Sequence, residues 1–303
     1  MCRTPVHRVV VGRPLPCRRH ERRRQGAGAF VPVAVGAACA SNADGAVWWR
    51  LALAATVSLA LKFVVNYSND YSDGVRGTDD ARVGPVRLVA SGLASPGAVK
   101  WAAIGSLAVA ACAGVVLGVI TTLWLMAVGA AALVAAWTYT GGPRPYGYAG
   151  LGEVFVFVFF GVVATTGTEF AIAERITGDS LVASVAVGCF ACALLVVNNL
   201  RDIPGDTDAG KRTLAVRMGD AATRRFFALL IAAAGVAVIA TAFTADVWAL
   251  TGLIGVFAAR PALDAVGRGT RGRDLIAVLG AVGRAQIVFG VTYSVGLALA
   301  LAG

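Results

Sequence analysis

Long apolar runs separated by polar connections dominate the hydrophobic pattern of this chain. Most runs contain about 18 or more residues with few charges, the length at which an α-helix can cross a lipid bilayer. Dividing the chain at the polar connections predicts nine helices, over residues 26–42, 46–66, 98–118, 121–140, 151–172, 180–199, 223–243, 246–262 and 275–300. The first is short, and Arg260 and Pro261 interrupt the eighth near its end. The pattern predicts an all-α polytopic membrane protein with nine transmembrane helices.

The composition agrees with a membrane protein and gives no sign of a second, soluble domain. The 303 residues are 57% hydrophobic and 15% charged, whereas a soluble domain carries about a quarter charged residues. Glycine and alanine are abundant in the apolar runs, and small residues let transmembrane helices pack closely as a bundle. Residues 1–25 are expected to form a disordered, basic, cytoplasmic leader, and residues 26–303 a single membrane domain.

The net charge of +10 is distributed unevenly. In the nine-helix division, the face opposite the N-terminus has only Arg50 and Arg175 near its turns. Nearly all other basic residues lie on the N-terminal face, in the leader and in the connections 67–100, 141–150, 200–225 and 260–274. The positive-inside rule then places the N-terminus and these connections in the cytoplasm and the C-terminus outside, in the plasma membrane. Because the loops lack interleaved aromatic residues, no nucleic-acid binding is expected.

The cysteines and histidines limit the possible chemistry. Cys189 and Cys192 have the spacing of a redox or metal motif, but they lie inside an apolar run without a second pair and are read as packing residues. His7 and His20 both belong to the leader, which excludes a histidine metal site or a histidine base within the bundle.

Carboxylates and amides follow the second predicted helix, in VVNYSNDYSDGVRGTDD at residues 64–80. If the helix continues into this stretch, Asn66, Asn69, Asp70 and Asp73 fall at i, i+3, i+4 and i+7, on one face. Asp79 follows in the loop. Such closely spaced carboxylates repel one another unless a cation lies among them, and carboxylate and amide oxygens suit Mg²⁺.

A second acidic cluster, VVNNLRDIPGDTDAGKRTLAVRMG at residues 196–219, follows the sixth predicted helix. Asn198, Asp202 and Asp206 are spaced i, i+4 and i+8, although Pro204 is expected to interrupt the helix after Ile203. A solvated loop with surface ion pairs would explain either cluster alone.

Two such clusters at the ends of even-numbered helices lie on the same side of the membrane, so they are expected to face each other across a cavity. Each would hold Mg²⁺, the metals would bridge one diphosphate, and Lys211, Arg212 and Arg76 would neutralise the remaining phosphate charge. A magnesium–diphosphate site in an apolar bundle indicates ionisation of an allylic diphosphate, with the isoprenoid tail and the allyl cation shielded from water.

Two other classes of membrane protein also use acidic residues and are alternatives for these clusters. The stretch DYSDG, residues 70–74, matches the start of the acidic motif of CDP-alcohol phosphotransferases, but the rest of that motif is missing. A membrane cation transporter would need acids near the middle of the bilayer, whereas these acids lie at helix ends.

Three stretches together resemble the UbiA family of intramembrane prenyltransferases, over roughly residues 29–300. They are NYSNDYSDGVRGTDDARVGPVRLVASGLASP, YTGGPRPYGYAGLGEVFVFVFFGVVATTGT and NNLRDIPGDTDAGKRTLAVRMG. Within the family, the likeness is strongest to the branch that acts on 1,4-dihydroxy-2-naphthoate. The chain departs from the family's usual Arg-Pro-rich opening, because an arginine run follows Arg13 and Pro14 and the likeness resumes at about Phe30.

The resemblance implies a nine-helix bundle whose central cavity lies under a cytoplasmic cap, formed by the connections after the second and sixth helices. It implies Mg²⁺-dependent transfer of a polyprenyl group from polyprenyl diphosphate to 1,4-dihydroxy-2-naphthoate with loss of CO₂, or to another aromatic acceptor such as 4-hydroxybenzoate or homogentisate. The implied metal ligands are Asn69, Asp70, Asp73, Asp79, Asp202 and Asp206. The implied catalytic residues are Asp73, Asp202 and Tyr139, and the implied substrate-binding residues are Asn66, Arg76, Arg144, Asn198, Lys211 and Arg212.

Several of these residues also have a plainer interpretation. Tyr139 would lie near the aromatic acceptor or in an interfacial aromatic belt. Arg144 would bind the acceptor carboxylate or act only as a topological charge. Glu153 is read as a charge at a helix N-terminus, and the phenylalanines that follow it as membrane packing.

Overall fold

The computed structural model describes residues 28–77 and 87–302, so the predicted leader and Asp79 lie outside the described residues. Within these ranges the chain is helical and has no strands. The helices are α2 (Phe30–Cys39), α3 (Arg50–Arg76), α4 (Pro96–Ile120), α5 (Trp124–Thr138), η1 (Tyr146–Ala149), α6 (Gly152–Val156), η2 (Phe157–Val163), α7 (Ala164–Ala173), α8 (Gly178–Asp208), α9 (Leu214–Thr244), η3 (Val247–Gly252), α10 (Leu253–Ala258), α11 (Arg260–Gly267), η4 (Gly272–Asp274) and α12 (Leu275–Ala302).

Seven helical segments in the described part of the chain are long and apolar enough to cross a membrane. Three of them combine several elements. The first joins α6, η2 and α7 without a break, the second joins η3 and α10 to α11 across a turn at Ala259, and the third joins η4 and α12. The first and fourth predicted helices correspond to α2 and α5, which are apolar but shorter. The prediction of an all-helical membrane protein is confirmed.

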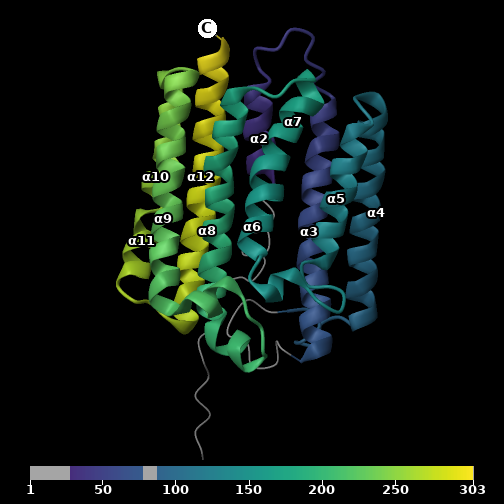
Figure 1. Ribbon diagram of the computed structural model, residues 1–303, viewed down its shortest axis with the longest axis vertical. Helices are drawn as coiled ribbons and strands as arrows, with labels where there is room; N and C mark the ends of the chain where they lie inside the picture. The colour runs from purple at the N-terminus through teal and green to yellow at the C-terminus, as the bar shows by residue number, and fades with distance from the viewer. Residues whose placement is uncertain (1–27, 78–86, 303) are drawn as a thin grey trace, which may run out of the picture.

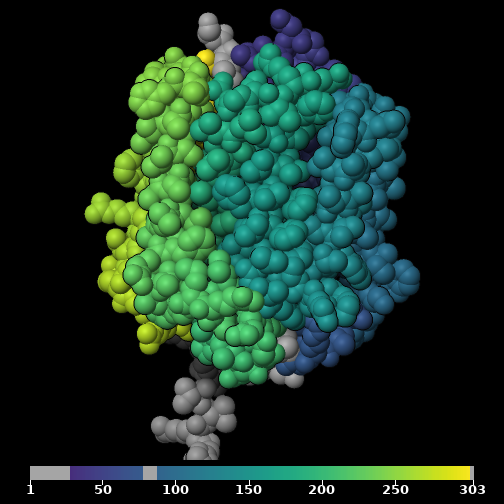
Figure 2. Space-filling model, viewed as in Figure 1, coloured from purple at the N-terminus to yellow at the C-terminus, as the bar shows by residue number. Residues whose placement is uncertain are grey.

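The helices stand side by side as a bundle (Figure 1). The end of α3 and the connections after α5 and α8 lie together at the lower end of this view, called here the site end, and the C-terminus lies at the opposite, far end. Helices α8, α9 and α12 form one side of the bundle and α3, α4 and α5 the other, with α2, α6 and α7 between them. The space-filling view shows these groups closely packed along most of their length (Figure 2).

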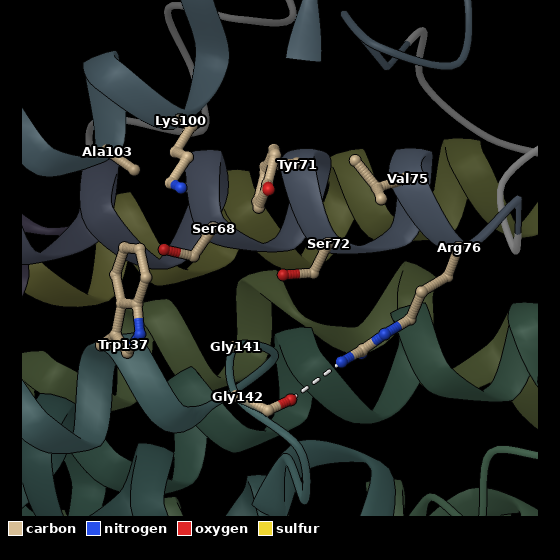
Figure 3. Close-up of a pocket in the computed structure, with 10 residues that line it drawn as sticks. All are labelled: Ser68, Tyr71, Ser72, Val75, Arg76, Lys100, Ala103, Trp137, Gly141 and Gly142. Carbon is tan, nitrogen blue, oxygen red and sulfur yellow. Dashed lines mark hydrogen bonds between the residues drawn. The ribbon is translucent and has the colours of Figure 1, made fainter. Parts of the chain in front are cut away.

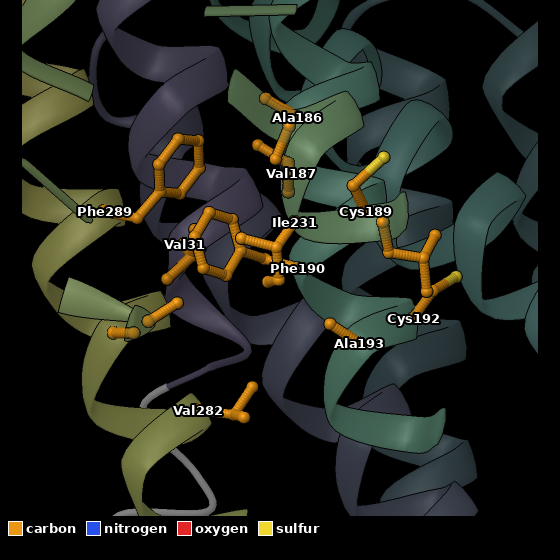
Figure 4. Close-up of a cluster of buried hydrophobic side chains, with 14 of the residues drawn as sticks. Val31, Ala186, Val187, Cys189, Phe190, Cys192, Ala193, Ile231, Val282 and Phe289 are labelled. Atoms are coloured by element: carbon orange, nitrogen blue, oxygen red, sulfur yellow. The ribbon is translucent and has the colours of Figure 1, made fainter. Parts of the chain in front are cut away.

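The hydrophobic core lies among α2, α8, α9 and α12, where aromatic rings pack through gaps left by small residues. The rings of Phe190 and Phe289 stack with centroids 4.5 Å apart (Figure 4). The centroids of the Phe289 and Tyr293 rings are 5.0 Å apart. Gly255 permits this packing, because a Cβ at its position would lie 2.2 Å from the Phe289 Cα. Glycine thus brings α10 and α12 into close contact, as small residues do in membrane bundles.

The span from Gly152 to Ala173 is not a regular α-helix. Its middle, η2, is a π-helix of seven residues over Phe157–Val163. Gly161 in η2 lies against α8, where a Cβ would come within 2.5 Å of the Gly188 Cα. Pi-helical segments are rare in proteins and are found frequently at functional sites.

The helices beside both acidic clusters are longer than the apolar pattern predicts. The α3 helix continues to Arg76, which confirms that the first cluster lies on a helical face. The α8 helix passes through Pro204 to Asp208, so the expected interruption is wrong. The last turn is held at its end by the amide groups of Ala209 and Lys211, which donate to the carbonyls of Gly205 and Asp206 at 2.9 and 2.8 Å. These contacts offset the hydrogen bond that proline removes from the helix.

Candidate active site

The two acidic clusters meet at Lys211. Its ammonium group lies 2.8 Å from Asp73 Oδ1, on α3, and 3.8 Å from Asp206 Oδ1, near the end of α8. Gly210, with φ of 71°, turns the chain directly after α8 and brings Lys211 back over the helix end. Asp73 and Lys211 are 4% and 8% exposed, so this ion pair is shielded from water. The expectation that the clusters face each other is met for these two carboxylates.

Asp73 is surrounded by further polar groups. The Tyr148 hydroxyl donates to Asp73 Oδ1, and the Tyr148 ring lies 4.6 Å from the Lys211 ammonium. In the orientation that satisfies both of its partners, the Asn69 amide donates to Asp73 Oδ2 at 2.7 Å and accepts from the Arg87 guanidinium at 2.9 Å. Asp73 is therefore the centre of the hydrogen-bond network in the described part of the site.

Asp70, although on the same helix, binds backbone instead. Its two carboxylate oxygens accept hydrogen bonds from the amide groups of Leu88 and Val89, at 2.9 and 3.1 Å. This arrangement attaches the stretch before α4 to α3. In this conformation Asp70 positions a loop rather than facing Lys211.

An arginine binds the two other predicted site residues on α8, the metal ligand Asp202 and the substrate-binding Asn198. Arg201, 5% exposed, donates to both carboxylate oxygens of Asp202 at 2.7 Å and to Asn198 Oδ1 at 2.9 Å. This bidentate pair fixes the Asp202 carboxylate in one orientation.

Arg76 extends from the end of α3 toward the connection after α5. It donates to the carbonyl of Gly142 at 2.9 Å (Figure 3) and to that of Thr140 at 3.2 Å. Its guanidinium lies 5.1 Å from the centre of the Tyr148 ring. Figure 3 also shows Arg76 at the edge of a pocket of about 210 Å³ between α3, α4 and the end of α5. Arg76 and Lys211 therefore both lie over the Tyr148 ring.

The other predicted substrate-binding residues lie around this network. Asn66 is half-buried on α3, one turn before Asp70, and Arg144 and Arg212 are exposed. The backbone amide of Arg212 donates to the Tyr148 carbonyl at 2.9 Å, so the connections after α5 and α8 hold each other at the site end.

An apolar cavity of about 140 Å³ begins beside the network. Tyr139 and Tyr146 line it at the site end, Phe155, Phe159 and Phe160 along α6 and η2, and Ala171 toward the far end. Burial, and then the charges of Glu153, Asp73 and Asp206, raise the pKa of the Tyr139 phenol above its ordinary value. Tyr139 therefore stands as a neutral group between the acids and the cavity.

The residues at Lys211 fit a divalent cation. Asp73 and Asp206 approach one positive charge from two helices, and the Asn69 amide lies beside Asp73. Among the described residues, no three acidic, histidine or cysteine side chains converge on a single metal position. This donor set suits Mg²⁺, which takes one or two carboxylates and completes its shell with phosphate and water oxygens.

Sequence reasoning missed several residues of this region. Tyr148 and Arg201 carry the hydrogen bonds of Asp73 and Asp202, yet their residue types alone gave no indication of a partner far along the chain. Lys62 was detectable, because it is a charge within an apolar run. Its ammonium lies 5.8 Å from the ring of Phe160, which lines the cavity.

Replacement of Tyr148 by phenylalanine tests the role of its hydroxyl group. Removing one hydrogen bond to a charged group costs about 1.5–3 kcal/mol, so kcat/KM is expected to fall between about tenfold and a hundredfold. Burial, and then the Asp73 carboxylate, raise the pKa of Tyr148. The phenol therefore stays protonated and donates throughout neutral pH, and the variant's pH–rate profile between about pH 6 and 9 should match the wild type.

Tyr67→Phe is the matched control, since Tyr67 lies on α3 and stacks on Phe63 with centroids 5.9 Å apart. Its activity should stay near wild type. Equal activity of the Tyr148→Phe and Tyr67→Phe variants would contradict a role for the Tyr148 hydroxyl.

A bundle of apolar helices with a buried acid–lysine network at the head of an apolar cavity is the arrangement expected of an intramembrane enzyme acting on a lipid-like diphosphate. The model of the UbiA prenyltransferase family matches residues 29–278. The chain belongs to the UbiA prenyltransferase family.

The chain also matches individual proteins of known name over most of its length. The chain is 50% identical over 270 residues to the 1,4-dihydroxy-2-naphthoate octaprenyltransferase of Mycobacterium tuberculosis, covering 89% of this chain and 92% of that protein. It is 35% identical over 217 residues to the protein of the same name from Escherichia coli, covering 67% and 68%.

Solved structures share the fold at low identity. A UbiA homologue from Aeropyrum pernix, without ligands, has a TM-score of 0.70 and 16% identity, covering 93% of this chain and 99% of that one. A UbiA homologue from Archaeoglobus fulgidus, bound to DMAPP and Mg²⁺, has a TM-score of 0.59 and 16% identity, covering 90% and 97%.

Proposed function

We propose that this protein transfers a polyprenyl group from a polyprenyl diphosphate to 1,4-dihydroxy-2-naphthoate, with loss of CO₂. The product is demethylmenaquinol, which oxidises to demethylmenaquinone in menaquinone biosynthesis. The observation that carries the proposal is the meeting of Asp73 and Asp206 at Lys211, directly beside an apolar cavity. The names of the two naphthoate-prenylating relatives support this choice of acceptor.

The polar network would hold the diphosphate and the apolar cavity the start of the isoprenoid tail. Asp73, Asp206 and Asp202, with Asn69, would hold Mg²⁺, as four of the six metal ligands predicted from the sequence, and Asn198 would contact the substrate. The chemistry that bound Mg²⁺ supplies is stabilisation of the charge on the departing diphosphate. Lys211 would move from the carboxylates toward the phosphate oxygens, and the aromatic walls would exclude water from the allyl cation.

The acceptor would bind where the network and the cavity meet. Tyr139 lines this junction, and Lys62 provides a positive charge within the span, over Phe160. An ammonium group in an apolar environment favours an anionic partner, which the carboxylate of an aromatic acid supplies. Lys62 is a better-placed candidate for that contact than Arg144, which is exposed in its loop.

The distribution of basic residues is the basis of the membrane topology that we propose for this enzyme. Nine helices cross the plasma membrane, with α2 and α5 as the two short ones. The N-terminus and the site end are cytoplasmic, the C-terminus is outside, and the connections after α3 and α8 form a cap over the site. Basic residues in the connections at the site end, among them Arg76, Arg144 and Arg212, support this orientation.

The test is an assay of the purified protein in detergent with radiolabelled polyprenyl diphosphate and Mg²⁺. Parallel reactions contain 1,4-dihydroxy-2-naphthoate or 4-hydroxybenzoate, each with an EDTA control. Metal-dependent prenylation of the naphthoate with CO₂ release is expected. Product from hydroxybenzoate alone would overturn the acceptor but keep the reaction class, and no product from either would overturn the proposed function.

A further inference from the structure

Glu153 is a buried carboxylate that the network around Asp73 leaves out. It lies in the first turn of α6, within a membrane-spanning segment, and is 4% exposed. Its Oε1 atom accepts a hydrogen bond from the Asn199 amide at 2.8 Å. Its Oε2 atom is buried and has no hydrogen-bond partner among the described residues. Burying an unsatisfied carboxylate oxygen is costly, and ionisable groups within membrane spans are usually functional.

Glu169, in the same span, shows how a structural carboxylate is satisfied. It is fully buried near the far end, and its two oxygens accept from the backbone amide and the hydroxyl of Thr177 at 3.0 and 2.8 Å. Glu153 lacks such a second donor. The difference indicates that Glu153 Oε2 is kept for a group that is not part of the chain.

The surroundings of Glu153 indicate what that group is. Its neighbour Gly152 lies against Tyr139, since a Cβ on Gly152 would stand 3.6 Å from the Tyr139 hydroxyl oxygen. Tyr139 lines the apolar cavity, and the charges of Asp73, Asp206 and Glu153 all act on it. Glu153 therefore lies close to Tyr139, the residue that lines the cavity and is reached by the charges of Asp73 and Asp206. An acceptor ring must come to the place where the network and the cavity meet to reach the allyl carbon.

We propose that Glu153 is a catalytic base that accepts the proton of a ring hydroxyl group of the aromatic acceptor. This inference rests on the proposed function. The ring carbon that carries the carboxylate, next to the hydroxyl, bonds to the allyl carbon as the hydroxyl O–H bond breaks and its proton passes to Glu153 Oε2. Loss of the carboxylate as CO₂ returns its bonding pair to the ring, and the ring oxygen takes the proton back from Glu153.

The groups beside Glu153 leave it as the base of this cluster. Tyr139, from the connection after α5, stays protonated because burial raises its pKa. Tyr146, from η1, stacks on Phe155 at 4.0 Å and packs edge-on against Tyr139. The Cys192 thiol, from α8, donates a hydrogen bond to the backbone carbonyl oxygen of Glu153 at 3.1 Å, so the thiol proton is already engaged.

The experiment compares Glu153→Gln with Glu169→Gln, a matched loss of a buried carboxylate in the same span. Glutamine preserves the acceptor oxygen for Asn199 but cannot take a proton. At neutral pH, Glu153→Gln should lower kcat with 1,4-dihydroxy-2-naphthoate by about 10²–10⁴-fold, the usual contribution of a general base. Its kcat should rise nearly tenfold per pH unit, because ionisation of the ring hydroxyl in solution replaces the base, and Glu153→Asp should recover part of the rate.

The outcomes separate the two proposals. The wild type and the Glu169→Gln variant are expected to have the same pH–rate profile. The Glu153→Gln variant is expected to keep the wild-type KM for the donor. A Glu153→Gln variant with the wild-type rate and pH dependence would overturn the base assignment alone. The same holds if both glutamine variants lose activity with unaltered pH profiles, which would indicate a structural role. A wild type that prenylates no naphthoate would overturn the proposed function, and the base assignment with it.

Discussion

Replacing Asp73 by asparagine should reduce polyprenyl transfer by about 10³-fold or more while leaving the protein folded. A factor of 10³ corresponds to about 4 kcal/mol in the activation barrier. Asparagine keeps the shape of the side chain and an oxygen that accepts from Tyr148, but it removes the charge that Lys211 now pairs with at 2.8 Å. The measurement is the initial rate with saturating donor and acceptor, together with the melting temperature of the purified variant.

Asp220→Asn is the matched control for this prediction. Asp220, on α9, pairs with Arg224 at 2.6 Å and takes no part in the network around Asp73. Its loss should leave the rate near wild type. An Asp73→Asn variant that keeps more than a tenth of the wild-type rate, roughly 1.4 kcal/mol or less in the barrier, would contradict the assignment of Asp73 to the magnesium–diphosphate site.

Replacing Lys211 by methionine should weaken binding of the diphosphate donor and strengthen binding of Mg²⁺. The KM for polyprenyl diphosphate should rise and kcat/KM should fall by about 10²-fold, because a charged partner of the phosphates is lost. Mg²⁺ alone should bind the variant more tightly than the wild type. The reason is that Asp73 and Asp206 then share no ammonium group and repel each other until a cation arrives.

Melting temperatures at increasing Mg²⁺, without donor, measure the second effect, since a ligand that binds only the folded protein raises its stability. Lys100→Met is the control, because the Lys100 ammonium also lies over an aromatic ring, 5.9 Å from Tyr71, but has no role in the network. Equal Mg²⁺ responses in the Lys211→Met variant, the control and the wild type would show that Asp73 and Asp206 do not form a cation site.

The helical membrane architecture and the face of α3 were predictable because both depend on local periodicity. An apolar run long enough to span a bilayer specifies a helix almost by itself. Continuing that helix by the 3.6-residue repeat places Asn66, Asn69, Asp70 and Asp73 together. The same reasoning failed at Pro204, where hydrogen bonds beyond the helix end preserve a turn that the local sequence disfavours.

The partners within the site were not predictable, because each joins residues far apart in the chain. Two residues bind Asp73 from far along the chain: Tyr148 is 75 positions away from it and Lys211 is 138 positions away. Asp70 shows the limit of motif reasoning, since it belongs to the acidic pattern and yet its carboxylate holds the backbone at Leu88 and Val89. Arg201 counted as a topological charge in the sequence, and burial against Asp202 gives it a different role.

The π-helix η2 makes the number of residues in its span as important as their identity. A π-helix closes i→i+5 hydrogen bonds, so each of its turns holds about one residue more than an α-helical turn. If all seven residues of Phe157–Val163 were α-helical instead, everything on one side of η2 would turn by about 100° and shift by about 1.5 Å relative to the other. Glu153 and Phe155 precede η2, whereas Ala171 follows it. The π-helix therefore sets how the reacting end of the pocket is aligned with its lipid-like end, and a change that straightened η2 would misalign the two ends without altering any side chain that takes part in the chemistry.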